Sequence, residues 1–104
     1  MDKPEIRLRR DKEADLVLVG PTLLGEVSSE RPGVERWTEL RLWRLPSGVF
    51  VAEQVGRSRI EGERDRCRAW QCADHAEVVE RLRRGWLARE LYGKLGIDGS
   101  ERVI

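Results

Sequence analysis

Apolar and polar residues alternate along much of the first two-thirds of the chain. Ile6 and Leu8 alternate with arginines, and the apolar run Leu16–Val19 follows a charged break. Period-2 alternation and short apolar runs are typical of β-strands with at least one buried face. We therefore predict strands around residues 6–9, 16–19 and 22–27, followed by a polar loop over residues 28–35.

The clearest hairpin signal joins residues 37–45 to residues 49–60 through the tripeptide Pro46-Ser47-Gly48. A three-residue loop ending in glycine is a common hairpin connection. The alternative two-residue loop sets Leu42 opposite Glu53, which is the less favourable pair. The preferred register gives four cross-strand pairs: Trp43 with Val51, Arg41 with Glu53, Leu42 with Ala52, and Leu40 with Gln54.

A charged turn over residues 61–65 leads to a last predicted strand over residues 66–72. Two helices are then expected, over residues 74–84 and 86–95. Asp74 and Glu77 form the capping-box pattern at the start of the first helix. Gly85 and Gly96 are the expected left-handed terminators of the two helices.

These elements predict an α+β fold: an antiparallel β-meander of four to six strands with two short C-terminal helices packed on one face. The 104-residue length fits one domain, residues 1–104, with a flexible tail over residues 98–104. Charged residues make up 38% of the chain, but the net charge is only +1, which is not the signature of a disordered protein. The longest apolar run is too short for a membrane span, and the N-terminus lacks a signal-peptide pattern. We expect a cytoplasmic protein.

Catalytic patterns are weak, and we expect a protein that is not an enzyme and uses no cofactor. The single histidine, His75, falls at a predicted helix start beside Asp74. No serine stands in a nucleophile-elbow pattern, and the glycines form neither a P-loop nor a dinucleotide fingerprint. Most carboxylates have an arginine nearby, as on a solvated surface.

The cysteines do not predict a metal site or a disulfide. Cys67 and Cys72 are five residues apart in one predicted strand, so their side chains are expected on opposite faces. The spacing to His75 is not that of a structural zinc site. We expect two free thiols.

One face of the predicted hairpin combines aromatic and charged residues in a way that suits binding. Tryptophan and arginine dominate the energetics of protein interfaces, and they also suit single-stranded nucleic acid. We expect Trp43 at the centre of this face. The alternative, left open, is that the N-terminal strands fold over it and bury the tryptophans. The candidate binding residues on this face are Trp37, Arg41, Trp43 and Arg57.

Five arginines gather around the turn that follows the hairpin, and they could clamp phosphates. However, Glu61, Glu63 and Asp65 are interleaved with them, which favours solvated salt bridges. Arg59, Arg66 and Arg68 are nevertheless kept as candidate binding residues. The cluster comprises Arg57, Arg59, Arg64, Arg66 and Arg68.

These observations favour a small, arginine-rich, non-enzymatic protein that binds another protein as a regulator, inhibitor or assembly subunit, of the kind that phages and plasmids often encode. The alternative is a domain that binds single-stranded or structured nucleic acid through its Trp/Arg sheet face. No membrane partner is expected, and homo-oligomerisation is left open.

Overall fold

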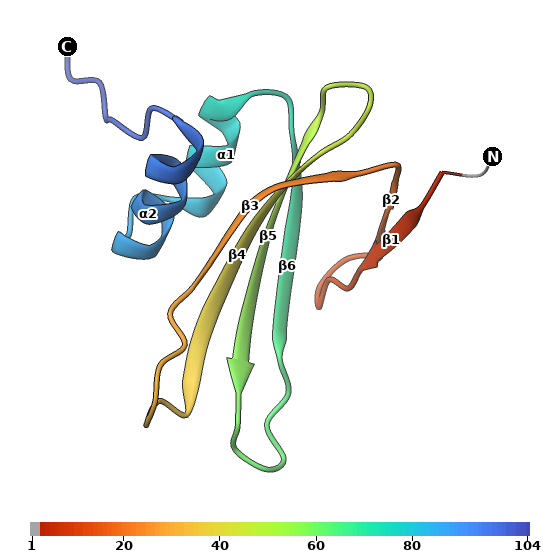
Figure 1. Ribbon diagram of the computed structural model, residues 1–104, viewed down its shortest axis with the longest axis vertical. Helices are drawn as coiled ribbons and strands as arrows, with labels where there is room; N and C mark the ends of the chain where they lie inside the picture. Colours follow the sequence, from red (N-terminus) through yellow and green to blue (C-terminus); the bar gives the residue numbers. More distant parts are fainter. Residues whose placement is uncertain (1–2) are drawn as a thin grey trace.

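A four-stranded antiparallel sheet is the centre of the computed structural model, which describes residues 3–104 (Figure 1). Its strands are neighbours in the order in which they follow along the chain, as in the predicted meander. The α+β fold is confirmed. The strands are β3 (Thr22–Ser28), β4 (Arg36–Arg44), β5 (Phe50–Ser58) and β6 (Arg66–Cys72).

The predicted register of the central hairpin is also confirmed. Trp43 pairs with Val51, and the other three predicted pairs hold as well. The backbone N–H of Leu45 donates to the carbonyl of Val49 at 2.8 Å, which closes the loop. Gly48 takes a φ of 91°, the conformation for which glycine is preferred at this position.

Strands β1 (Glu5–Leu8) and β2 (Leu16–Val19) form a separate two-stranded hairpin. This hairpin lies against the face of the central sheet that is turned away from the helices (Figure 1). The predicted meander is therefore the four-stranded part, and the β1–β2 hairpin is an additional layer.

Helices α1 (His75–Leu82) and α2 (Trp86–Leu95) cover the other face of the sheet. The side chain of Asp74 accepts a hydrogen bond from the Glu77 N–H at 2.9 Å, and Gly96 ends α2 with a φ of 66°, both as predicted. The predicted terminator of α1 is wrong. Arg83, with a φ of 68°, ends α1 because its N–H returns to the carbonyl of Val79, and Gly85 instead caps the start of α2. Within residues 3–104, no helix is long and apolar enough to cross a membrane.

Two hydrophobic clusters hold the three layers together. The larger one lies between the sheet and the helices and includes Leu42, Val78 and Leu91, which are fully buried. The smaller one lies beneath the β1–β2 hairpin and consists of Leu8, Leu18, Val51 and Ala69.

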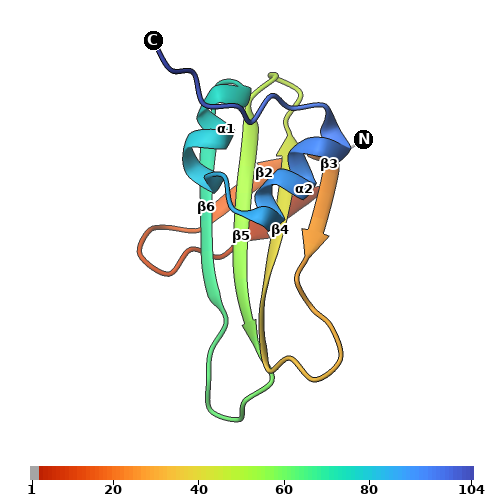
Figure 2. The ribbon, with the colours of Figure 1, turned by 90° about the vertical axis from the view of Figure 1, so that its left-hand side faces the viewer.

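The helices and the β1–β2 hairpin cover the same half of the long strands, on opposite faces (Figures 1 and 2). The strands continue well past both layers towards the loops at residues 29–35 and 59–65. We call this part of β4, β5 and β6 the open half of the sheet; it comprises residues 36–39, 54–58 and 66–68.

Candidate binding surfaces

The first surface is on the face of the sheet turned away from the helices, mostly on the open half, and its centre is Glu39. One carboxylate oxygen of Glu39, Oε1, accepts hydrogen bonds from Arg41 Nη2 and from Arg57 Nε, both at 3.0 Å. The other oxygen, Oε2, accepts from the indole N–H of Trp37 at 3.2 Å. We call this surface the Trp–Arg face; it comprises Trp37, Glu39, Arg41, Arg57 and Arg59.

Further carboxylates surround the two arginines of this network. Arg41 also donates to Glu26 at 3.0 Å and lies 3.7 Å from Glu53. Arg57 also donates to Asp65 at 2.8 Å. The network thus sets four carboxylates against two guanidinium groups, so the surface around Glu39 has an excess of negative charge.

The ring of Trp37 is held from a second side by Arg59. The guanidinium carbon of Arg59 lies 4.8 Å from the centre of the indole ring, within the range of a cation–π contact. Arg59 is also ion-paired with Glu30. Every arginine of the Trp–Arg face therefore has a carboxylate partner.

The protonation of Glu39 reflects these contacts. Burial raises the pKa of Glu39, but hydrogen bonds from Trp37 and Arg57, with the charges of Arg57 and Arg41, outweigh that effect and lower the pKa overall. Glu39 is therefore held as a carboxylate, the form that accepts all three hydrogen bonds.

The β1–β2 hairpin covers the other end of this face, where Trp43 lies. Trp43 is half-buried against the cluster beneath the hairpin, and its indole N–H donates to Glu53 Oε1 at 3.1 Å. The N-terminal strands thus cover Trp43 and leave Trp37 on the open half. Trp43 is not at the centre of an open face, and its part in binding stays a prediction.

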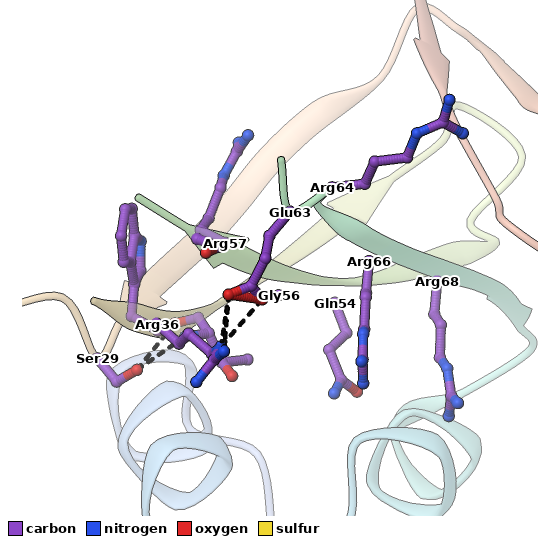
Figure 3. A pocket seen from close by; sticks show the side chains of 12 residues that line it. Ser29, Arg36, Gln54, Gly56, Arg57, Glu63, Arg64, Arg66 and Arg68 are labelled. Atoms are coloured by element: carbon purple, nitrogen blue, oxygen red, sulfur yellow. Dashed lines mark hydrogen bonds and ion pairs between the residues drawn. The ribbon is translucent and has the colours of Figure 1, made fainter. Parts of the chain in front are cut away.

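The second surface is a groove of about 510 Å³ on the opposite, helix-side face of the open half (Figure 3). Arg66 and Arg68 extend from β6 into the groove, and Gln54 lies beside them on β5. Gly56 is opposite Arg66 and contributes no side chain, which keeps the floor open. Trp37, Arg57 and Arg64 also line the groove, but the side chains of Arg57 and Arg64 extend the other way. We call this groove, with Arg66, Arg68, Gln54 and Gly56, the arginine groove.

The structure divides the five clustered arginines into two groups. Arg57 and Arg59 are ion-paired on the Trp–Arg face. Within residues 3–104, no ion pair joins Arg64, Arg66 or Arg68 to a carboxylate. The predicted neutralisation by salt bridges thus holds for only part of the cluster.

One carboxylate does line the arginine groove, but another arginine holds it. Glu63 accepts two hydrogen bonds from Arg36 Nε and one from Arg36 Nη2, the last at 2.7 Å. These hydrogen bonds from Arg36, opposed by a weaker effect of burial, lower the pKa of Glu63. The charge of Arg66 makes a smaller contribution to this lowering. Because Glu63 is ion-paired with Arg36, the guanidinium groups of Arg66 and Arg68 are left for another anion.

A second hollow, of about 230 Å³, continues from the arginine groove towards the helices. The two share Ser29, Thr38 and Gln54 as lining residues. The far end is apolar and includes Leu87 and Trp86, of which Trp86 is 57% exposed. We call this the Trp86 hollow.

Sequence reasoning did not single out Trp86 or Gln54. A signal for Trp86 was present in α2, because the buried positions Leu87, Ala88, Leu91 and Tyr92 set the core-facing stripe. Trp86 lies on the opposite side of the helix from that stripe, which a helical projection of the sequence could have shown.

The chain was also compared with known proteins. No family model, no curated protein and no solved structure matches it.

The two cysteines lie on opposite faces of β6, as the five-residue spacing predicts. Cys67 pairs with Val55, which faces away from the helices, and Cys72 is buried in the helix-side core. Burial raises the pKa of the Cys72 thiol to about 11. Within residues 3–104, no group of three histidine, cysteine, aspartate or glutamate side chains is arranged to hold a metal ion.

Proposed function

We propose that this protein is a non-enzymatic, cytoplasmic binding protein whose partner is another protein, held at the Trp–Arg face. The observation that carries the proposal is the network around Glu39, on the half of the sheet that neither the helices nor the β1–β2 hairpin covers. The partner is regulated, inhibited or assembled by this contact.

The charge of the Trp–Arg face supports a protein partner over a nucleic acid. A surface that binds phosphates needs guanidinium groups that are free to replace counterions. Arg41, Arg57 and Arg59 are all engaged by carboxylates, and the carboxylates around Glu39 outnumber the arginines. A phosphate backbone would meet net repulsion here, whereas a protein surface with mixed or basic groups would not.

The rigidity of Trp37 also supports an interface. Its indole N–H is fixed by Glu39, and its ring is fixed by Arg59. An aromatic side chain that is ordered before binding loses little entropy when a partner covers it. Tryptophan and arginine are the residues most enriched at the energetic centres of protein interfaces.

The proposal is tested with the intact protein, purified with its partner from nuclease-treated cells of its natural source. The partner is then prepared separately, and the complex is titrated by calorimetry with the parent, Trp37→Ala and Trp86→Ala. Trp86→Ala is the matched control, because it removes an exposed tryptophan from the other side of the sheet. We expect Trp37→Ala to lose about 2 kcal/mol of binding free energy, a weakening of roughly thirtyfold, and Trp86→Ala to bind like the parent.

Two results contradict the proposal. In one, Trp37→Ala binds the purified partner as tightly as the parent. In the other, the only molecule that co-purifies is a nucleic acid protected from the nuclease. Light scattering shows whether the only partner is a second copy of the chain. If it is, and Trp37→Ala makes the protein monomeric, the protein interface is one of self-association.

A further inference from the structure

We propose that the arginine groove and the Trp86 hollow together bind a short segment of single-stranded nucleic acid. The phosphates would contact Arg66 and Arg68, and a base would stack on Trp86. This inference does not rest on the proposed protein partner, because Arg66, Arg68 and Trp86 lie outside the Trp–Arg face, although Trp37 and Arg57 also line the groove.

The phosphate end of the site is defined by Arg66 and Arg68. They are two residues apart on β6, so they lie on the same face at a spacing of about 7 Å along the strand. Neither is ion-paired within residues 3–104, and both extend into the groove (Figure 3). Two guanidinium groups at this spacing can each take one of two successive phosphates.

The base end of the site is defined by Trp86. More than half of its surface is exposed, so its ring is accessible to a base. Stacking of a base on an aromatic ring tolerates any sequence, since every base has a π-face. The Trp86 hollow opens into the arginine groove through shared lining residues, so one short strand could reach both ends.

The floor between the two ends is polar. Thr38 and Gln54 line both hollows, and Ser29 lies beside them. The Gln54 amide, like the hydroxyl groups beside it, can both donate and accept hydrogen bonds, so it matches the donors and acceptors on the edge of a base. Gly56 lies beside Arg66, where an added Cβ would make an ordinary van der Waals contact with the Arg66 Cβ at 3.6 Å.

An extended acidic peptide fits this site less well. Such peptides gain most of their affinity by adding a strand to an open sheet edge. The neighbouring edge of β6 is already occupied, because Cys67 donates its N–H to Asp11 Oδ2 at 2.8 Å and accepts the Asp11 N–H at 3.1 Å. Arg10 also donates to the carbonyl of Ala69 at 3.4 Å.

The test uses the full chain and a fluorescein-labelled oligothymidylate of about eight nucleotides, a length within the range of one small binding domain. Fluorescence anisotropy gives the affinity as the salt concentration is varied. Two phosphate contacts predict a slope of about −1.4 for the logarithm of the association constant against the logarithm of the salt concentration. The same oligonucleotide as a duplex is expected to bind more weakly.

Matched variants separate the two ends of the site. Trp86→Ala is expected to weaken binding by about tenfold, with the salt slope unchanged. The double variant Arg66→Gln/Arg68→Gln is expected to bring the slope close to zero. Its control, Arg7→Gln/Arg44→Gln, removes the same charge away from the groove and should bind like the parent. Circular dichroism checks that each variant is folded.

The inference is overturned if the oligothymidylate does not bind. It is also overturned if Arg66→Gln/Arg68→Gln and its control Arg7→Gln/Arg44→Gln weaken oligothymidylate binding equally. It is also overturned if a polyglutamate peptide competes as well as unlabelled oligothymidylate, which would make the groove a general anion site. Because Arg66, Arg68 and Trp86 take no part in the network around Glu39, failure of this inference leaves the proposed protein interface untouched.

Discussion

Trp37 donates its indole N–H to Glu39, two residues further along the same face of β4, over 3.2 Å. The other oxygen of that carboxylate is shared between Arg41 and Arg57, each at 3.0 Å. One half-buried acid therefore orders an aromatic ring and two cations on a part of the sheet that no other element covers. Removing the charge of Glu39 should loosen all three at once.

The first prediction concerns the pH dependence of that effect. The pKa of Glu39 is lowered in the folded protein, so its contribution to stability is complete well above the ordinary value of 4.5 and is lost as the pH falls through the folded pKa. We expect Glu39→Gln to be less stable than the parent at neutral pH, and the difference to shrink as the pH falls below 4.5. Urea unfolding across this range measures it.

The control for this prediction is Glu101→Gln, in the exposed C-terminal tail. The free energy of unfolding of this variant should equal that of the parent at every pH. If the difference in free energy of unfolding between the parent and Glu39→Gln stays constant down to the lowest pH, the charge of the carboxylate contributes nothing to stability.

The second prediction concerns Trp43. Because it packs against the cluster beneath the β1–β2 hairpin, Trp43→Ala should lower the free energy of unfolding by about 3 kcal/mol. For a domain of this size, that corresponds to a fall in Tm of about 15 °C. Trp86→Ala, at a 57% exposed position, is the control and should change Tm by only a few degrees, about 1 kcal/mol or less. Similar Tm values for the two variants would mean that the hairpin is not held by Trp43.

The third prediction separates the two thiols. Burial raises the pKa of both thiols, to about 11 for the buried Cys72, whereas Cys67 is only half-buried at the sheet edge. Since the thiolate is the reactive form, iodoacetamide should modify Cys67 at least about tenfold faster in the native protein. Mass spectrometry of the peptides gives both rates, and the urea-unfolded protein is the control in which they should converge. Equal rates in the native state would contradict the burial of Cys72.

Local signals made much of the fold predictable. The central hairpin register follows from its loop, because pairing Leu45 with Val49 fixes every later pair by period 2. The start of α1 follows from Asp74 and Glu77. The Asp74 carboxylate accepts a hydrogen bond from the Glu77 N–H, and the Glu77 carboxylate accepts one from the Ala73 N–H. Such features depend on neighbours a few residues away, so the sequence displays them directly.

The arrangement of the layers depends on distant contacts and could not be predicted in the same way. The β1–β2 hairpin is held in place partly by the hydrogen bond from the Cys67 N–H to the Asp11 carboxylate, 56 residues away in the sequence. The position of the hairpin decides which tryptophan is covered. The partner of Arg36 is Glu63, 27 residues away. The candidate site was therefore predicted only in part: Trp37, Arg41 and Arg57 do share one surface, whereas Arg66 and Arg68 belong to another.

The most direct test of the account uses the four tryptophans as reporters. The protein is labelled with 5-fluorotryptophan, and its fluorine NMR resonances are assigned with single Trp→Phe variants. When the purified protein partner is added, we predict that the Trp37 resonance shifts or broadens and that the Trp86 resonance stays in place. A partner that perturbs Trp86 and leaves Trp37 unchanged would contradict the claim that the Trp–Arg face is the protein interface.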